Sequence, residues 1–266
     1  MTDLQQVTAE AQPAYDSIAS QYVEVRKEHL LQPLLNYNVY KRMLKPLLDN
    51  HGLLTGKRVL DLACGEGVHT RHLKALGCAY ILGVDLSPTI IELARQTELQ
   101  NPEGIEYMAA DVKQLPTPEK SFDLVTSFYL LNYAKTREEL LQMAKAVYAQ
   151  LGENKQFISV TTNVAEGQKV FNQRKYGVTA HTLAPIDGDM PDGTEFTVIL
   201  YNERDEPACT FSNYHLSAET YEQVFKEAGF KSFQWVPFQS NPNDPNKAFY
   251  DDYINSPDSI GVIATK

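Results

Sequence analysis

The sequence predicts an α/β protein built on a doubly wound parallel sheet. Short β-branched and apolar runs alternate with helical segments between residues 57 and 162, the order expected when helices connect parallel strands. The length of 266 residues and a hydrophobic fraction of 43% favour one elaborated domain over residues 1–266. Such a sheet binds its ligands in a crevice at the carboxyl ends of the strands.

Two helices are expected before the sheet. Residues 13–27, "PAYDSIASQYVEVRK", and residues 33–50, "PLLNYNVYKRMLKPLLDN", both open with a proline, a residue favoured in the first turn of a helix. Gly52 is expected to end the second helix.

Strands and helices then alternate. Gly77 is a helix stop, and Ser87 followed by Pro88 is a helix start with a side-chain cap. The expected strands cover 57–63, 79–85, 105–111, 121–128 and 156–162, and the expected helices cover 67–77, 87–100 and 136–151. Residues 57–162 are therefore expected to form the ligand-binding core.

The alternation stops after Thr162. Residues 163–216 hold no clear helix but contain two alternating runs, 195–202 and 208–216, that predict an antiparallel hairpin. An excursion of this kind beside a binding crevice is a candidate lid or substrate site. Residues 217–266 resume the core with a helix at 217–230 and strands at 231–238 and 259–266.

Composition limits the partners and the compartment. A formal net charge of −10 and a pI near 5.1 argue against nucleic acid and anionic membranes as partners. The cysteines Cys64, Cys78 and Cys209 lack metal-ligand spacing and indicate a reducing compartment. No signal peptide or membrane span is visible, so a soluble, cytoplasmic protein is expected. The pair His69 and His72 has no third ligand and is interpreted as surface histidines, so no metal is predicted.

The segment 59–67, "VLDLACGEG", has the outline of a nucleotide-binding turn with the wrong charge for phosphate. A dinucleotide turn, G-x-G-x-x-G, needs three glycines, but only Gly65 and Gly67 are present and Thr70 stands at the third position. Asp61 and Glu66 would also repel a pyrophosphate at short range. An acidic glycine turn suits a cationic ligand instead.

Aspartates at the ends of the next two strands extend the hypothesis of a cationic, phosphate-free ligand. Asp85, followed by Leu86, ends the second strand where a carboxylate accepts hydrogen bonds from a ribose diol. Asp111 ends the third strand and could accept from the amine of a base, with Val112 packing on the ring. An ammonium, a ribose and an adenine together describe S-adenosylmethionine. Each acid could instead serve as a helix cap or turn residue, most plainly Asp111.

At these residues the chain resembles class I S-adenosylmethionine-dependent methyltransferases. "VLDLACGEG", "GVDLSP", "AADV" and "FDLVTSFYLLNYA" correspond to that family's successive motifs over residues 57–162. The resemblance implies a Rossmann-like sheet of seven strands, with the last strand, 259–266, antiparallel and inserted between the fifth and sixth. "SFYLLNYAKTREEL", "NYHLS" and "RKYG" are similar to a narrower group related to toxoflavin-biosynthesis methyltransferases, which methylate ring nitrogens of azapteridines. The turn "LGENKQ" departs from the family's usual Pro-Gly-Gly.

The resemblance and the residue types together give the candidate site. "YDSIASQY" is similar to a cap helix of small-molecule members, which implies that Tyr15 and Tyr22 face the cofactor, although the two could form only a packing stripe. The expected cofactor-binding residues are Tyr15, Tyr22, Asp61, Ala63, Gly65, Gly67, Asp85, Leu86, Asp111, Val112, Phe128 and Tyr129. Phe128 and Tyr129 could offer π faces to a sulfonium or be plain core aromatics.

Candidates for acid–base chemistry lie in or beside the excursion. They are His181, His215 and Tyr176, and Asn132, Tyr176 and Tyr214 are expected to bind the substrate. Each lone histidine could equally be structural, because methyl transfer to a heteroaromatic nitrogen or acidic hydroxyl needs mainly positioning and exclusion of water.

The sequence thus predicts S-adenosylmethionine-dependent N- or O-methylation of a small, planar, heteroaromatic molecule. Two other readings stay open, an NAD(P)-dependent oxidoreductase on a related fold and a non-catalytic S-adenosylmethionine-binding module. The acceptor and the oligomeric state are not predicted.

Overall fold

The computed structural model of the protein describes Val25 and residues 29–266. The predicted first helix, 13–27, and the candidates Tyr15 and Tyr22 lie outside the described residues, apart from Val25. None of the helices in the described part of the chain combines the length and apolar character needed to cross a bilayer.

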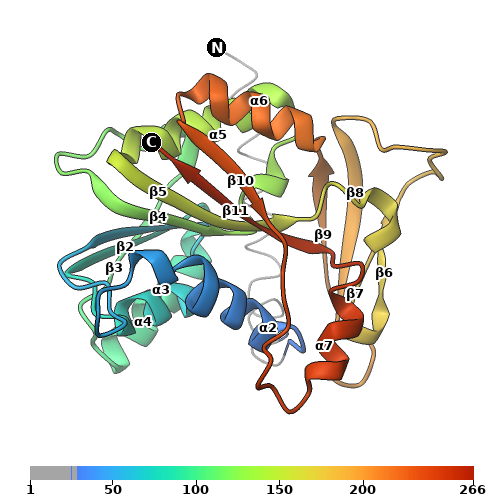
Figure 1. Ribbon diagram of the computed structural model, residues 1–266, viewed down its shortest axis with the longest axis horizontal. Helices are drawn as coiled ribbons and strands as arrows, with labels where there is room; N and C mark the ends of the chain where they lie inside the picture. Colours follow the sequence, from blue (N-terminus) through green and yellow to red (C-terminus); the bar gives the residue numbers. More distant parts are fainter. Residues whose placement is uncertain (1–24, 26–28) are drawn as a thin grey trace.

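A seven-stranded mixed sheet forms the centre of the protein (Figure 1). Its spatial order is β10-β11-β5-β4-β1-β2-β3. The last strand, β11, runs antiparallel to both of its neighbours, β10 and β5, and all other pairs are parallel. The α/β doubly wound fold and the inserted antiparallel final strand are therefore confirmed. The strands are β1 (Arg58–Leu62), β2 (Tyr80–Asp85), β3 (Glu106–Ala109), β4 (Phe122–Phe128), β5 (Leu151–Thr162), β10 (Ser232–Val236) and β11 (Ser259–Thr265).

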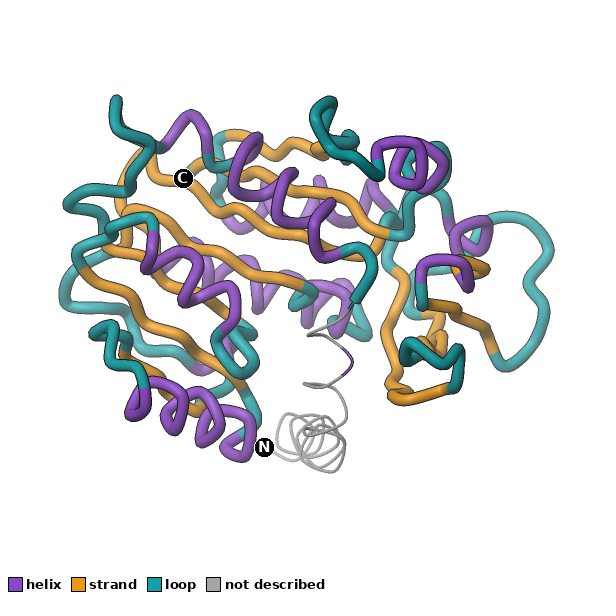
Figure 2. The backbone as a smooth tube through the Cα atoms, turned by 90° about the horizontal axis from the view of Figure 1, so that it is seen from below, coloured by secondary structure: helices purple, strands orange, loops and turns teal. Residues whose placement is uncertain are grey.

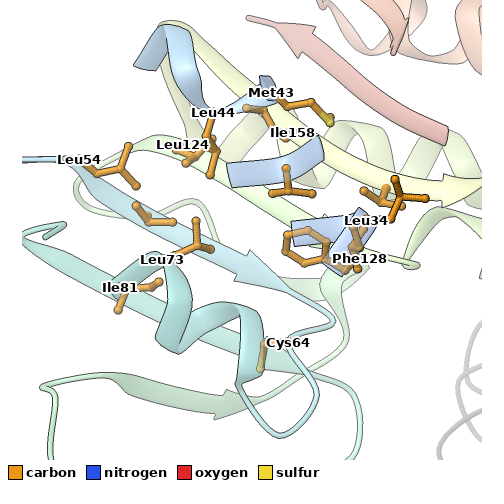
Figure 3. Packing of buried hydrophobic residues seen from close by; sticks show 14 of the residues in the cluster. Leu34, Met43, Leu44, Leu54, Cys64, Leu73, Ile81, Leu124, Phe128 and Ile158 are labelled. Carbon is orange, nitrogen blue, oxygen red and sulfur yellow. The ribbon is translucent and has the colours of Figure 1, made fainter. Parts of the chain in front are cut away.

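Helices cover both faces of this sheet (Figure 1). One face carries α2 (Gln32–Asn36), α3 (Val68–Ala75) and α4 (Pro88–Gln100), and the other carries α5 (Arg137–Gln150) and α6 (Ala218–Ala228). A separate apolar core fills each interface, because the strands are buried from both sides. Figure 3 shows the first of these cores, in which Leu73 of α3 and Leu34 of α2 pack near Ile158 of β5 and Phe128 of β4.

Side-chain caps fix where the helices begin. Ser87 accepts a hydrogen bond from the backbone of Ile90 at 3.2 Å, Thr136 from Glu139 at 3.3 Å and Ser217 from Thr220 at 3.3 Å. Each bond satisfies an N–H that has no partner within its helix. These starts place the preceding strand ends, and therefore the crevice, at defined positions.

The predicted second helix, 33–50, is shorter and irregular. After α2 the chain continues as a π-helical segment, Tyr37–Met43, in which Leu44 donates to Val39 five residues back, and then as a 3₁₀ turn, Lys45–Leu47. Pro46 lacks an N–H and cannot extend regular helical bonding. The prediction of one regular helix was wrong in this respect.

Residues after β5 form a second, four-stranded antiparallel sheet at one end of the molecule (Figure 2). Its order is β6-β7-β8-β9, with β6 (Asn172–Gln173), β7 (Val178–Thr182), β8 (Thr194–Tyr201) and β9 (Pro207–His215). The predicted hairpin is confirmed as β8 and β9. The sequence did not predict β6 and β7, nor the helix α7 (Lys247–Tyr253) that precedes the final strand.

Candidate functional site

The turn from β1 to α3 is held in left-handed backbone conformations. Ala63, Gly65 and Gly67 have φ values of 53°, 57° and 85°, and a left-handed alanine costs free energy that a fold keeps mainly at functional sites. Gly67 is the N-cap of α3, and a Cβ there would lie 2.2 Å from the hydroxyl oxygen of Tyr107. The turn is therefore both strained and tightly packed.

Asp61 anchors this turn from beneath. Its side chain is completely buried. One carboxylate oxygen accepts from the Thr70 hydroxyl at 2.7 Å, and the other accepts from the Thr126 hydroxyl at 2.8 Å. The predicted ammonium-binding carboxylate thus joins the end of β1 to α3 and to β4, and its charge lies under the turn.

Asp85 closes the turn from the side of β2. Its Oδ2 accepts from the backbone N–H of Gly65 at 2.9 Å, and its Oδ1 accepts from that of Ser87 at 3.0 Å. Burial raises the pKa of Asp85, against the effect of these two hydrogen bonds, and the nearby Glu66 carboxylate raises it further. Each oxygen retains a lone pair for a ligand.

Glu66 is buried within the acidic turn. Its side chain is 7% exposed, and within the described part of the chain neither carboxylate oxygen has a hydrogen bond. A buried carboxylate without a partner is costly. The pKa of the nearby Cys64 thiol is raised well above its usual value. Burial is the largest cause, followed by the negative charges of Asp85, Asp61 and Glu66. The turn is an acidic site that a cation would satisfy, and Cys64 is a protonated, buried packing residue.

The third predicted acid is engaged locally. Asp111 accepts a hydrogen bond from the backbone of Lys113 at 2.9 Å and caps a 3₁₀ turn, with Val112 buried behind it. Leu86 is half-buried beside Asp85. Asp111 and Leu86 lie where β3 and β2 end, at the same edge of the sheet as the glycine turn.

The end of β4 holds two aromatic residues with different surroundings. Phe128 is buried and stacks on His69, with ring centroids 3.9 Å apart. His69 is itself buried, and its Nδ1 lies 2.7 Å from the Tyr40 hydroxyl, so the prediction of a surface His69 was wrong, whereas His72 is exposed. The first turn of α3 faces the sheet there, which buries His69. In residues 29–266 no three His, Cys, Asp or Glu side chains gather as a metal site would require.

Tyr129, the residue after β4, turns the chain toward a cavity. Its φ is 63°, a left-handed value unusual for tyrosine, and its hydroxyl lies 3.0 Å from the Ser259 hydroxyl. The cavity, of about 130 Å³, lies between the ends of β4 and β5 and the four-stranded sheet. Its walls are mainly apolar and aromatic, with Tyr129, Tyr133, Phe171, Phe196, Phe211 and Phe238 among the lining side chains.

The structure places the predicted catalytic and substrate residues outside this cavity lining. His181 is exposed on β7, and His215 is buried at the end of β9, where burial lowers its pKa. Tyr176 is buried, and its hydroxyl donates to the Phe249 carbonyl and the Asp252 carboxylate, both at 3.3 Å.

The two remaining substrate candidates also have other neighbours. Asn132 is buried beside Thr161, whose hydroxyl donates to it at 3.5 Å. The Tyr214 ring lies 5.2 Å from Lys135 Nζ. Neither side chain lines the cavity.

Sequence reasoning missed the residues that do line the cavity near its polar end. Asp258 and Ser259 stand at the start of the final strand, and Asn213 stands on β9. One signal was available, because an antiparallel final strand must begin at the edge where the parallel strands end.

The comparisons agree with this geometry. Residues 59–153 match the family described as "Methyltransferase domain" (Methyltransf_25). A ubiquinone biosynthesis O-methyltransferase from Nitrosococcus oceani is 38% identical over 87 residues, which cover 32% of this chain and 36% of that relative. The chain thus matches only about a third of that curated relative's length.

Solved structures extend the likeness to the whole fold. An S-adenosylmethionine dependent methyltransferase from Mesorhizobium loti superposes with a TM-score of 0.55 at 21% identity, over 84% of this chain and 96% of that one. Magnesium protoporphyrin IX methyltransferase from Synechocystis PCC 6803, solved with bound SAH, gives a TM-score of 0.61 at 15% identity, over 98% and 99%.

The family match and the fold likeness point to the same kind of domain. Residues 59–153 are similar to a methyltransferase domain, and the chain shares its fold with solved structures of S-adenosylmethionine-dependent methyltransferases. Its residues 59–153 carry the family match, from β1 through α5 into β5.

Proposed function

We propose that the protein is an S-adenosylmethionine-dependent methyltransferase that acts on a small planar molecule. The observation that carries this proposal is Glu66, a buried carboxylate with no hydrogen-bond partner in the described residues, placed inside the left-handed turn of a methyltransferase domain. The site has negative charge ready for a ligand that brings positive charge, as the ammonium and sulfonium of S-adenosylmethionine do.

The residues around the turn fit this cofactor. Asp85 keeps lone pairs for a ribose diol, and the left-handed turn at Gly65 and Gly67 allows close approach of a ligand to the backbone. A dinucleotide fits less well, because its pyrophosphate would bind near the start of α3. There the carboxylates of Asp61, Glu66 and Asp85 would repel its negative charge. S-adenosylmethionine, when bound, supplies an activated methyl group for an in-line displacement.

The protein's own contribution is placement and exclusion of water. The half-buried Tyr129 follows β4, the neighbour of β1, so the cavity adjoins the edge of the sheet that carries the glycine turn. Apolar walls keep water away from a reacting nucleophile and hold an aromatic ring flat. Well-oriented reactants can gain on the order of 7–11 kcal/mol from positioning in ideal cases.

The acceptor is proposed to be a small, aromatic or heteroaromatic molecule that is methylated on nitrogen or oxygen. The aromatic lining of the cavity supports a planar ring, and its volume of about 130 Å³ supports a small one. The relative named as a ubiquinone biosynthesis O-methyltransferase supports oxygen as the atom methylated.

Transfer of a radiolabelled methyl group tests the proposal. The wild-type protein is incubated with methyl-labelled S-adenosylmethionine and a panel of phenols and nitrogen heteroaromatics, and labelled product is extracted and counted. Product with at least one acceptor, absent when the protein is heat-inactivated, supports the function. Binding of the cofactor without turnover of any acceptor would instead indicate a non-catalytic binding module.

A further inference from the structure

The cavity beside Tyr129 contains one carboxylate among its described lining residues. That residue is Asp258, and the other lining groups able to ionise are His29 and the tyrosines Tyr129, Tyr133 and Tyr253. No lysine or arginine is among the described residues of the lining. A carboxylate in an otherwise aromatic cavity needs hydrogen-bond donors, so an oxygen that the walls leave unbonded needs a donor from the occupant.

Neighbouring hydroxyls hold Asp258 by one oxygen. Its Oδ1 accepts from the Tyr253 hydroxyl and, at 2.7 Å, from the Ser259 hydroxyl. The Ser259 oxygen also lies 3.0 Å from the Tyr129 hydroxyl. Among the described residues, none donates a hydrogen bond to the other oxygen, Oδ2. Asp258 is therefore fixed in orientation and keeps one oxygen available.

Topology brings this carboxylate to the reacting edge of the sheet. Ser259 of β11 pairs with Thr162, the last residue of β5, and the Tyr129 backbone bonds to Val160 of the same strand. The strand β11 lies beside β5 in the central sheet (Figure 1). Because the two strands are antiparallel and Ser259 pairs with Thr162, the residue before β11 lies where β5 ends. Asp258 thus lies beside the chain that leaves β4, the neighbour of β1 and its glycine turn.

A second unsatisfied group lies in the same lining. Asn213 of β9 is 4% exposed, and its Oδ1 has no hydrogen-bond partner among the described residues. Asn213 comes from the four-stranded sheet, whereas Asp258 immediately precedes β11 of the central sheet. An occupant that satisfies both carries two N–H or O–H donors on a planar ring.

We propose that Asp258 is the catalytic base for the methyl acceptor, which is an uncharged aromatic ring bearing an acidic O–H or N–H and a second donor. This inference rests on the proposed methyltransferase function and specifies its substrate class. The acceptor proton passes to Oδ2, and the freed electron pair forms a bond to the methyl carbon. The carbon–sulfur bond breaks with its electrons staying on sulfur, and the proton then leaves Asp258 for solvent.

The surroundings of Asp258 suit a proton acceptor. Burial raises its pKa, opposed by the Tyr253 and Ser259 hydrogen bonds, and a base works best when its pKa approaches the working pH. The lack of a lysine or arginine in the described lining also disfavours acceptors that carry a carboxylate or phosphate, since Asp258 would repel them.

Binding measurements test the substrate class separately from turnover. With saturating S-adenosylhomocysteine, catechol is expected to bind the wild-type protein, and 2,3-dihydroxybenzoate is expected to bind at least about 10-fold more weakly. Asp258→Leu should weaken catechol binding about 10- to 100-fold, as expected for a lost charge-assisted hydrogen bond. Asp251→Leu, at a partly exposed carboxylate on α7 that pairs with Lys247 and lies outside the cavity lining, is the matched control and should bind catechol as the wild type does. Equal binding of catechol by wild type and Asp258→Leu, or tighter binding of the benzoate, would overturn the proposal.

Turnover then tests the base. Asp258→Asn keeps an acceptor for Tyr253 and Ser259 but cannot take the proton, so kcat should fall about 10²- to 10⁴-fold with the KM for S-adenosylmethionine unchanged. The loss should shrink with 4-nitrocatechol, which is already partly ionised at neutral pH. An equal loss with catechol and 4-nitrocatechol would reject Asp258 as the base, and so would undiminished activity.

The two proposals fail in different ways. If S-adenosylhomocysteine does not bind the wild-type protein, the methyltransferase function is wrong. If it binds and a nitrogen or oxygen acceptor is methylated, but the Asp258 variants behave as the wild type, only the role of Asp258 is wrong.

Discussion

The backbone N–H of Gly65 donates a hydrogen bond to Oδ2 of Asp85 at 2.9 Å. This contact ties the glycine turn after β1 to the end of β2, so the proposed ribose-binding carboxylate and the proposed methionine-binding turn hold each other in place. The protein's own hydrogen bonds therefore hold the proposed cofactor-binding crevice in shape before a ligand binds. Binding then needs little rearrangement, which preserves affinity.

Asp85 should make cofactor binding sensitive to acid. Because burial raises its pKa, Asp85 takes up its proton at a higher pH than an ordinary aspartate. A raised pKa also means that the stability contributed by this group is present below the unfolded pKa and is lost as pH rises through the folded pKa. Once protonated, Asp85 is no longer a charged acceptor for the ribose diol, so the affinity for S-adenosylhomocysteine should fall on acidification. Calorimetry at several pH values should show this dependence in the wild type.

An Asp85→Asn variant provides the control. Its affinity at neutral pH should fall by about 1–3 kcal/mol through weakened hydrogen bonds, and most of the acid dependence should disappear. Retention of both the affinity and its pH profile would remove Asp85 from the ribose site.

Glu66→Gln should stabilise the free protein and weaken the complex. Removing a buried, unpartnered charge relieves a desolvation cost, so the melting temperature without ligand should rise. Affinity for S-adenosylmethionine should drop by about 1.5–3 kcal/mol if the carboxylate bonds the cofactor. Differential scanning fluorimetry and calorimetry measure the two effects, with Glu103→Gln at an exposed site as the reference. A lower melting temperature with unchanged affinity would mean that Glu66 is only structural.

Thr126→Val should destabilise the protein strongly. The Thr126 hydroxyl donates to the completely buried Asp61 at 2.8 Å, and loss of a donor to a buried carboxylate costs about 1–3 kcal/mol or more. Thr126→Ser keeps the donor and should lose much less. Urea unfolding of the two variants measures the difference, and equal losses would show that only the methyl group matters.

The two glycines of the turn should differ in their response to alanine. At Gly67 a Cβ would meet the Tyr107 hydroxyl at 2.2 Å, whereas at Gly65 nothing lies within 4 Å. Both positions have positive φ, so Gly65→Ala should cost about 1 kcal/mol of backbone strain, and Gly67→Ala should cost clearly more. Thermal unfolding in the absence of ligand tests this order. A larger loss for Gly65→Ala would contradict the packing of Tyr107 against the turn.

The central sheet was predictable because local signals agreed with the global fold. Ser87 and Ser217 marked helix starts, and the motif from Val59 to Gly67 marked the first crossover, each with a chemistry visible in a few neighbouring residues. The burial of His69 was not visible in this way. It depends on Phe128, a residue of a distant strand that stacks on the histidine ring.

The cavity was also hard to predict because it is assembled from segments far apart in the chain. Asp258, Asn213 and Tyr129 come from two sheets and meet only after β11 enters the sheet antiparallel. The sequence made Tyr176 a candidate for acid–base chemistry, yet its hydroxyl donates hydrogen bonds to two residues of α7. The short aromatic segment that forms α7 shows no helical periodicity in the sequence.

Calorimetric titration of the wild-type protein with S-adenosylmethionine and with NADH tests the account most directly. The acidic turn around Glu66 should bind the cationic, phosphate-free nucleoside and show no measurable heat with the dinucleotide at the same concentrations. Tight binding of NADH together with no binding of S-adenosylmethionine would contradict the account.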